Sequence, residues 1–517
     1  MAFELQSSNK NDSETKLIAS VDLGSNSFRM VVAQIIETPS GYQLRPVDTL
    51  RDPIKLAAGL NSEKNLDADA IARGLSSIRR FGERLRSFSP MQVRAVATNT
   101  LRVARNAPQF IHQAEMALGF PIEVIAGREE ARLVYVGAAH GAPAIAGNRL
   151  VIDVGGGSTE FIIGHGYEAK LMESLYIGCV SHSQKFFANG AVDSYSFKQA
   201  ELAARQEIQI LSKEFRKKGW DQVVGSSGTA KAIAELIILN GFEGGDYSGF
   251  DSSGLITRDG LENLKSSLIE SELMQASELI GLKPDRRQVL PGGLAIMIAA
   301  FDELKIESME IVEAALRMGV LYDFLGRSQH HDMRFVTVEQ FMKRYAVDVE
   351  QAMRVEQLAR IFLEQFPVPE NEDRMNNLAL LGWAARLHEI GLSISHNGYH
   401  KHSAYISANA DMPGFSKNDQ ARLSALLIGH VGKLAKVSSS NHFIDWRMLF
   451  CLRLALVLSR RRVNEEIPEI FVQHSQDGYK ISIPKEWLES HPLTEFSLKK
   501  EADDWKKISR NYIIDRY

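Results

Sequence analysis

Residues suited to binding a phosphate lie between Val151 and Phe161, in the sequence VIDVGGGSTEF. Asp153 ends an apolar strand-like run, a glycine-rich turn follows, and Glu160 precedes a second apolar run. Glycines let backbone N–H groups approach a phosphate closely, and a carboxylate on each side of the turn can hold a divalent metal against it. The pattern predicts a phosphate-binding β-hairpin, although Asp before Gly is also common in a plain Asx turn.

A second copy of this pattern lies near the N-terminus, in ASVDLGSNSFRMVVA from Ala19 to Ala33. A duplicated strand–turn–strand phosphate clip predicts two related halves that face one cleft. The matching positions are Asp22 and Asp153, Gly24 and Gly155, and Ser27 and Ser158. A carboxylate beside phosphate oxygens needs Mg²⁺ to offset the repulsion, so the acids at these turns are candidate metal ligands.

Other segments add candidate groups for phosphate chemistry. The turn from Gly225 to Thr229 precedes a helical pattern and could form another anion pocket at a helix N-terminus. Glu129 and Glu130 begin a helix, where a carboxylate can also simply complement the helix dipole. Arg102 follows a Thr-rich strand end and could clamp a phosphate bidentately, although an arginine placed by sequence alone is usually a surface residue.

Bulk composition describes a globular chain of several domains. The 517 residues are 44% apolar and 24% charged, with a net charge of −4, which gives no overall attraction to nucleic acid. Chain length favours roughly three to four domains. Cys179 and Cys451 are far apart and outside metal-ligand spacing, so a reducing cytoplasm is the expected compartment. No apolar run reaches membrane-spanning length, and peripheral contact with the inner membrane is left open.

Hydrophobic periodicity predicts an α/β protein with a helical C-terminal half. Residues 1–15 read as a mobile tail, 16–135 as a β-meander followed by strand–helix alternation, and 136–314 as a second round of the same organisation. Residues 315–465 lack β-type alternation and read as successive amphipathic helices. Residues 466–517 contain Asp477–Gly478 between alternating runs, which predicts a hairpin in a small final α/β element.

A set of ordered segments resembles one enzyme family. The segments are VDLGSNSFRMVV, ATNTLRVARN, PIEVIAGREEARLVYVG, LVIDVGGGSTEFIIG, GCVSHSQKFF, GSSGTAKA and PGGLAI. Together they are similar to the exopolyphosphatase / guanosine pentaphosphate phosphohydrolase family. The resemblance implies two actin-like (ribonuclease H-like) domains around a cleft, and it extends into the helical half through WAARLHEIGLSISHNGYHKHSAYI and DMPGF.

The resemblance implies a hydrolase that removes terminal phosphate with Mg²⁺ and water, without a covalent intermediate. Glu130 would be the general base that activates water. Asp153 and Glu160, with Asp22, would manage the metal, and a monovalent cation such as K⁺ is left open as an activator. The residues implied to hold the terminal phosphate are Ser25, Asn26, Arg102, Gly155, Gly156, Gly157 and Ser158, with Cys179 near the cleft wall.

The helical half resembles an HD-type phosphohydrolase domain, followed by the small C-terminal element. Glu389 stands at the position where that domain needs Asp after His, so its metal site looks degraded. We instead expect His388, His400, Lys401 and His402 to help line a basic path for a long polyanion. A homodimer is the expected assembly.

Inorganic polyphosphate is the leading expected substrate, with processive cleavage as part of that hypothesis. Conversion of pppGpp to ppGpp at the same site is the nearest alternative, because the motifs are common to both activities. GCVSHSQKFF and HKHSAYI favour the polyphosphatase branch, and PKEWLESHPL favours the other. An ATP-dependent kinase of the same superfold and a non-enzymatic actin-like scaffold are more distant alternatives.

Overall fold

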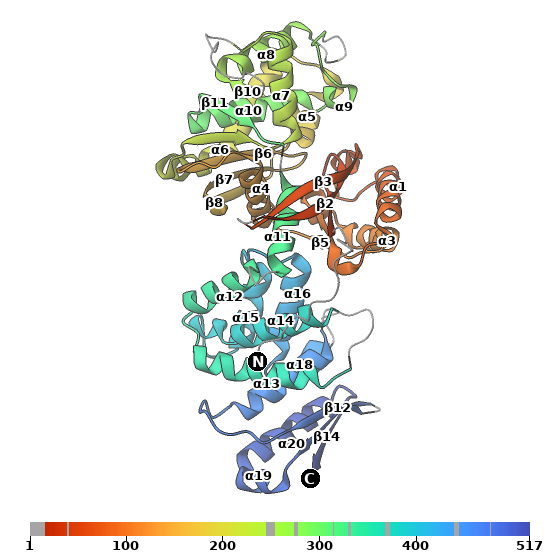
Figure 1. Ribbon diagram of the computed structural model, residues 1–517, viewed down its shortest axis with the longest axis vertical. Helices are drawn as coiled ribbons and strands as arrows, with labels where there is room; N and C mark the ends of the chain where they lie inside the picture. The colour runs from red at the N-terminus through yellow and green to blue at the C-terminus, as the bar shows by residue number, and fades with distance from the viewer. Residues whose placement is uncertain are drawn as a thin grey trace. The chain divides into compact units, whose positions relative to one another are not determined.

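The computed structural model describes residues 16–38, 41–243, 254–272, 274, 278–313, 315–328, 332–367, 373–438, 444–475 and 477–517. The expected tail, residues 1–15, lies outside this set. The chain forms two compact units with their boundary between residues 331 and 332 (Figure 1). No helix among the described residues is both long and apolar enough to cross a membrane.

The first unit begins with a mixed sheet of order β3-β2-β1-β4-β5. β1, β2 and β3 form the expected antiparallel meander, whereas β4 and β5 continue the sheet in parallel. Phe28, Phe81 and Phe110 are fully buried where α1 and α3 pack in this half. Its elements are β1 Leu17–Leu23, β2 Phe28–Thr38, β3 Gly41–Asp52, α1 Ala68–Leu85, β4 Val93–Ala97, α2 Asn99–Val103, α3 Ala107–Leu118 and β5 Ile122–Val124.

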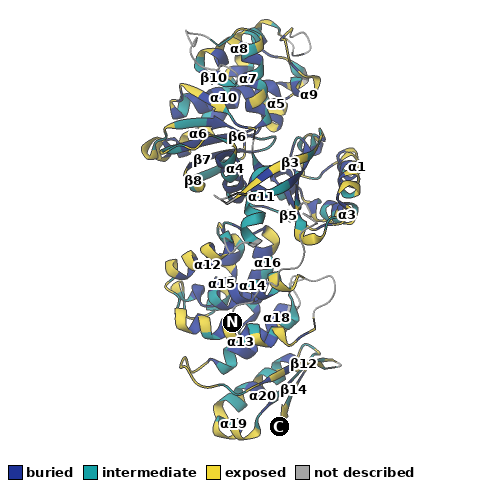
Figure 2. Ribbon diagram, in the orientation of Figure 1, coloured by how far each residue is buried: buried dark blue, intermediate teal, exposed yellow. Residues whose placement is uncertain are grey.

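The second half of this unit repeats the plan around a sheet of order β10-β11-β9-β6-β7-β8. Its core contains α10, which is apolar on all sides up to Phe301 and almost wholly buried (Figure 2). The strands are β6 Asn148–Val154, β7 Thr159–His165, β8 Glu168–Leu175, β9 Gln222–Gly225, β10 Leu255–Thr257 and β11 Ser308–Ile311. The helices are α5 Cys179–Phe186, α6 Ser194–Lys218, α7 Gly228–Leu239, α8 Arg258–Glu270, α9 Pro284–Arg287 and α10 Leu290–Leu304.

Two helices cross closely within the first unit: α4 (Gly127–Gly141) and α11 (Leu316–Ser328). A Cβ at Gly319 of α11 would overlap the carbonyl of Leu133 in α4, so glycine is required for this approach. Arg132 of α4 also pairs with Asp323 of α11 at 2.5 Å. The sequence placed residues 315–465 in one helical domain, but these contacts place α11 in the first unit.

The second unit joins a helical bundle to a small α/β element. Trp383, Phe450, Tyr479 and Trp505 belong to one hydrophobic core, so the segments expected as 315–465 and 466–517 share a core beyond α11. The expected Asp477–Gly478 hairpin joins β12 to β13. The helices are α12 Met333–Arg344, α13 Val349–Glu364, α14 Arg374–Leu387, α15 Tyr399–Asn409, α16 Lys417–Gly429, α17 Ala435–Ser438, α18 Trp446–Leu458, α19 Lys485–Ser490 and α20 Pro492–Lys506. The sheet has the order β12-β13-β14, from Phe471–Ser475, Gly478–Ile483 and Asn511–Arg516.

Candidate phosphohydrolase site

The two glycine-rich turns lie against each other in the first unit. The second turn is closed by the Gly155 N–H, which donates to the Ser158 carbonyl at 2.9 Å. A Cβ built on Gly156 would stand 3.0 Å from the Ser25 Cβ and 3.1 Å from the Asn26 backbone nitrogen. Gly156 therefore lets the hairpin of the second half approach the hairpin of the first, which is the facing arrangement that the duplicated pattern predicts.

A cavity of about 120 Å³ opens beside these turns. Most of the site residues expected from the sequence line it, namely Asp22, Ser25, Asn26, Glu130, Asp153, Gly155, Gly156, Ser158 and Cys179. Ser226, Ser227 and Thr229, from the glycine-containing turn before α7, line it as well. Arg102, Gly157 and Glu160 are not in its wall. The structure thus gathers residues from both clips and from the third turn around one space.

Buried carboxylates with raised pKa values lie at this site. Burial raises the pKa of Asp22 to about 7, and its Oδ1 has no hydrogen-bond partner among the described residues. Burial also raises the pKa of Asp153 to about 6, although Ser226 Oγ donates to Asp153 Oδ2 at 2.9 Å. Burial, with the nearby charges of Glu130 and Asp153, raises the pKa of Glu160 well above its usual range. Concentrated buried acids favour a cation between them.

The two adjacent glutamates at the start of α4 have different surroundings. Glu130 lines the cavity, and its Oε2 lies 2.7 Å from Arg102 Nη1. Glu129 turns away, where Arg132 Nε and Nη2 each donate to it at 2.8 Å. Of the pair, Glu130 has the geometry for a base in the cavity, whereas Glu129 belongs to the ion-pair network that holds α4.

Arg102, which the sequence suggested as a phosphate clamp, lies outside the cavity wall and contacts a cavity residue. Its Nη1 donates to the carbonyl of Ile125 at 2.9 Å as well as to Glu130. Its Nε is buried and has no hydrogen-bond partner among the described residues. In this structure Arg102 orients Glu130 from behind the cavity, and direct contact with phosphate stays a prediction.

Three cavity arginines were missed by the sequence reasoning: Arg29, Arg286 and Arg317. Burial, reinforced by the positive charge of Arg317, lowers the pKa of Arg29 to about 10. Burial also lowers the pKa values of Arg286 and Arg317, with Arg51 adding a like-charge effect on each. Like charges gathered in a partly buried space indicate a site for an anion. Arg29 aligns with Glu160 when the clips are superposed, a signal that the sequence offered.

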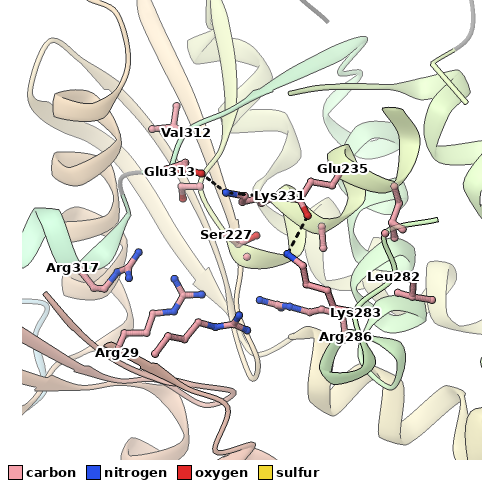
Figure 3. Close-up of a pocket in the computed structure, with 16 residues that line it drawn as sticks. Arg29, Ser227, Lys231, Glu235, Leu282, Lys283, Arg286, Val312, Glu313 and Arg317 are labelled. Carbon is pink, nitrogen blue, oxygen red and sulfur yellow. Dashed lines mark hydrogen bonds and ion pairs between the residues drawn. The ribbon is translucent and has the colours of Figure 1, made fainter. Parts of the chain in front are cut away.

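These arginines also line an adjoining pocket of about 260 Å³ (Figure 3). A Cβ at Gly228, the first residue of α7, would overlap the Arg286 guanidinium and would stand 3.3 Å from Arg29 Nη2. Glycine here lets both guanidinium groups reach the helix N-terminus, where anions are favoured. The other residues lining the pocket are Arg51, Ser226, Ser227, Lys231, Ala232, Glu235, Leu236, Gly281, Leu282, Lys283, Val312, Glu313 and Arg317.

In the second unit, the residues expected to line a polyanion path do not share one exposed surface. His388 is 1% exposed, and its Nδ1 lies 2.6 Å from the Ala385 carbonyl. Burial lowers the pKa of His388, which favours its neutral form. His388 is therefore not available to a surface path, which corrects that assignment. Lys401 is exposed and His400 and His402 are half-buried, so their part in a path stays a prediction.

No group of three or more His, Cys, Asp or Glu side chains is arranged to hold a metal within the described part of the chain. The donors at the turns nevertheless suit Mg²⁺, because Asp22 Oδ1 is buried without a partner and the neighbouring donors are carboxylates. Protein-bound Mg²⁺ is commonly held by one or two carboxylates together with substrate phosphates and water. The residues present fit a metal that arrives with a phosphate substrate.

Comparison with known proteins finds one family along both units. Residues 31–328 match the Ppx/GppA phosphatase family, and residues 333–502 match domain III of that family. The chain is 37% identical over 510 residues to a guanosine-5'-triphosphate,3'-diphosphate pyrophosphatase of Pseudoalteromonas translucida (strain TAC 125), which spans 97% of this chain and 99% of the relative.

Solved structures agree with the fold of the first unit. An exopolyphosphatase from Cytophaga hutchinsonii ATCC 33406 aligns with a TM-score of 0.53 and 21% identity, covering 60% of this chain and 97% of that one. An exopolyphosphatase-like protein aligns with a TM-score of 0.52 and 23% identity, covering 60% of this chain and 99% of that one. With two clips around one cavity and family matches along nearly its whole length, the chain belongs to the Ppx/GppA phosphatase family, hydrolases of phosphoanhydride bonds.

Proposed function

We propose that this chain removes the 5′-terminal phosphate of guanosine 5′-triphosphate 3′-diphosphate, pppGpp, to give ppGpp. The observation that carries the proposal is the 260 Å³ pocket, which shares Arg29, Arg286 and Arg317 with the cavity beside the clips. A nucleotide has a place for its remaining phosphates and base there while its terminal phosphate occupies the cavity. The name of the 37% identical full-length relative supports the same substrate. This reverses the order of substrates expected from the sequence.

In this proposal, backbone N–H groups of the two turns and the buried arginines hold the terminal phosphate. Glu130 accepts the proton of an attacking water, and Arg102 fixes the carboxylate of Glu130 in place through the 2.7 Å contact. Phosphoryl transfer needs mainly positioning and charge neutralisation, so arginines and amides around a base are a sufficient protein contribution. Water attacks phosphorus directly, and the shortened nucleotide departs with the bridging oxygen.

Mg²⁺ is the proposed cofactor, held by Asp153 and Glu160 with Asp22 close by. When bound, it would neutralise the charge of the phosphate oxygens beside these carboxylates. Without it, the acids and the substrate would repel each other at short range. Activation by K⁺ and assembly as a homodimer remain further proposals.

Inorganic polyphosphate is the second candidate substrate. The observation that favours it is that three further cations, Arg51, Lys231 and Lys283, line the side pocket. A linear chain of phosphates could follow these cations without using any group that recognises a base.

Phosphate release from pppGpp and from long polyphosphate, at matched concentrations of terminal phosphate, separates the candidates. We expect a kcat/KM for pppGpp higher by at least about 10-fold, because the guanosine group makes contacts in the side pocket that polyphosphate lacks. The E130Q variant controls for contaminating phosphatases. Efficient release from polyphosphate with little from pppGpp would reverse the proposal.

A further inference from the structure

We infer that Glu235, together with Lys283, hydrogen-bonds to the guanine base. This contact makes the 260 Å³ side pocket selective for guanosine over adenosine nucleotides. The inference rests on the proposed pppGpp activity and assigns base selectivity to one carboxylate of the pocket. Figure 3 shows Glu235 and Lys283 joined by a dashed line at the end of the pocket that also holds Leu282. The Lys283 Nζ lies 3.6 Å from Glu235 Oε2.

The chemistry of guanine suits an acceptor pair beside a donor. Its Watson–Crick edge offers N–H donors at N1 and N2 and an acceptor at O6. A carboxylate can accept from both N–H groups, and an ammonium can donate to O6. Adenine instead places an acceptor, N1, where guanine has a donor, so a carboxylate would face a lone pair. A Glu–Lys pair is therefore complementary to guanine and unfavourable for adenine.

The position of Glu235 on α7 suits contact with the base of a nucleotide whose phosphates bind at the start of that helix. Gly228, Lys231 and Glu235 are spaced at i, i+3 and i+7, so they lie on one helix face, and all line the pocket. Glu235 is about 10 Å along the helix from Gly228, using the helical rise per residue. Arg29 and Arg286 converge on Gly228, so phosphate binds at one end and the base at the other.

Local surroundings favour Glu235 over the other pocket carboxylate, Glu313. The Glu235 side chain is 37% exposed, and Leu236 and Leu282 provide apolar wall beside it. The Glu313 side chain is 77% exposed and pairs with Lys231. A less exposed carboxylate beside apolar groups discriminates better, because less water can reach it to replace the hydrogen bonds that a mismatched base does not make.

The test measures kcat/KM for pppGpp and for its adenine counterpart pppApp. The enzymes are the full-length wild type, E235Q, E235A and E313Q. We expect the wild type to favour pppGpp by about 10- to 100-fold, the value of one or two charge-assisted hydrogen bonds. E235Q should narrow or invert this ratio, because a carboxamide accepts from adenine N6 and donates to N1. E235A should lose pppGpp efficiency through KM, with kcat nearly unchanged and pppApp little affected.

The control variant is E262Q, which breaks a surface Glu–Lys pair of 2.9 Å on α8 outside the pocket and should leave both substrates unchanged. K283M removes the proposed hydrogen-bond donor to guanine O6 and should lower kcat/KM for pppGpp by about 3- to 10-fold. An unchanged pppGpp-to-pppApp ratio in both E235Q and E235A overturns the inference while the proposed function stands. A change confined to E313Q overturns the assignment to Glu235. A wild type that releases phosphate from neither nucleotide but does so from polyphosphate overturns the proposed function itself, and the inference with it.

Discussion

The two halves of the first unit use the same hairpin for different charges. In the first hairpin Asp22 pairs in register with Arg29, and in the second Asp153 pairs in register with Glu160. These pairs occupy matching positions, so a basic side chain in one clip replaces an acidic one in the other. The difference supports a division of work within the proposed function, in which Arg29 of the first clip attracts the anion and Asp153 and Glu160 of the second clip, with Asp22 close by, hold the metal.

The surroundings of the two hairpins reinforce this division. Arg29 is joined by Arg286 and Arg317, and burial lowers the pKa of each. Glu160 is joined by Asp153 and Glu130, and burial and mutual repulsion raise its pKa. The central strand order is nevertheless equivalent, because β3-β2-β1-β4-β5 corresponds to β8-β7-β6-β9-β11. A common frame thus positions Arg29 in one clip and Glu160 in the other at matching places near one cavity.

The largest expected effect concerns Glu130, which lies where the two clips meet. E130Q should reduce kcat by about 10²- to 10⁴-fold, because an amide cannot accept the proton of the attacking water. Substrate KM should change little. The neighbouring E129Q is the matched control and should keep kcat per folded molecule, since Glu129 bonds Arg132. Wild-type turnover in E130Q would show that Glu130 is not the general base.

The next largest effect is on stability and concerns Asp323 of α11, which pairs with Arg132 of α4 and Arg94 of β4. Asp323 is buried; burial alone would raise its pKa, but Arg132, Arg94 and Arg327 outweigh burial and lower it. D323N should reduce the free energy of unfolding by about 3 kcal/mol, because it removes the buried carboxylate that Arg94 and Arg132 have in common and leaves each of them with one acidic partner, Glu123 and Glu129 respectively.

The pH dependence of this effect has a definite sign. A depressed pKa in the folded state stabilises above the unfolded pKa of about 4, and this stability is lost as pH falls further. Denaturant titrations between pH 3 and pH 7 should show the D323N deficit shrinking toward the acid end. A deficit that stays constant with pH would mean that packing, and not charge, is what Asp323 contributes.

A moderate effect on substrate binding is expected from Arg29 in the first clip. R29Q should raise KM for pppGpp by about 10-fold with a smaller change in kcat, because one charged hydrogen bond to phosphate is lost. Increasing salt should weaken wild-type binding more than that of R29Q. Initial rates across a series of KCl concentrations check this, and equal salt dependence of the two enzymes would argue against phosphate contact by Arg29.

The smallest effect concerns Cys179, in the cavity wall. Burial raises the pKa of its thiol, so it remains neutral and is a poor nucleophile. C179A should retain kcat within about threefold, consistent with direct attack by water. A loss of several orders of magnitude, or a trapped phosphocysteine in mass spectrometry, would instead indicate a covalent step.

Much of this arrangement could be predicted from the sequence, because local patterns encode it. Alternation and glycine turns located the hairpins, and the repeated Asp-containing turn indicated two halves with one cleft. The pairing of Arg102 with Glu130 could not be predicted, because it joins segments that no local pattern connects. Arg29 was overlooked because an arginine in a strand resembles an ordinary solvent-facing residue. The burial of His388 and the packing of α11 on α4 likewise depend on tertiary contacts.

A Mg²⁺ titration of wild type, E160Q and R29Q tests the division of charge between the clips most directly. Initial rates at fixed pppGpp should show that E160Q needs about 10- to 100-fold more Mg²⁺ for half-maximal activity, since a carboxylate of the proposed metal site is lost. R29Q should need the same Mg²⁺ concentration as the wild type for half-maximal activity when pppGpp is raised well above the higher KM of this variant. Identical Mg²⁺ curves for E160Q and wild type, or a shifted curve for R29Q alone, would contradict the account.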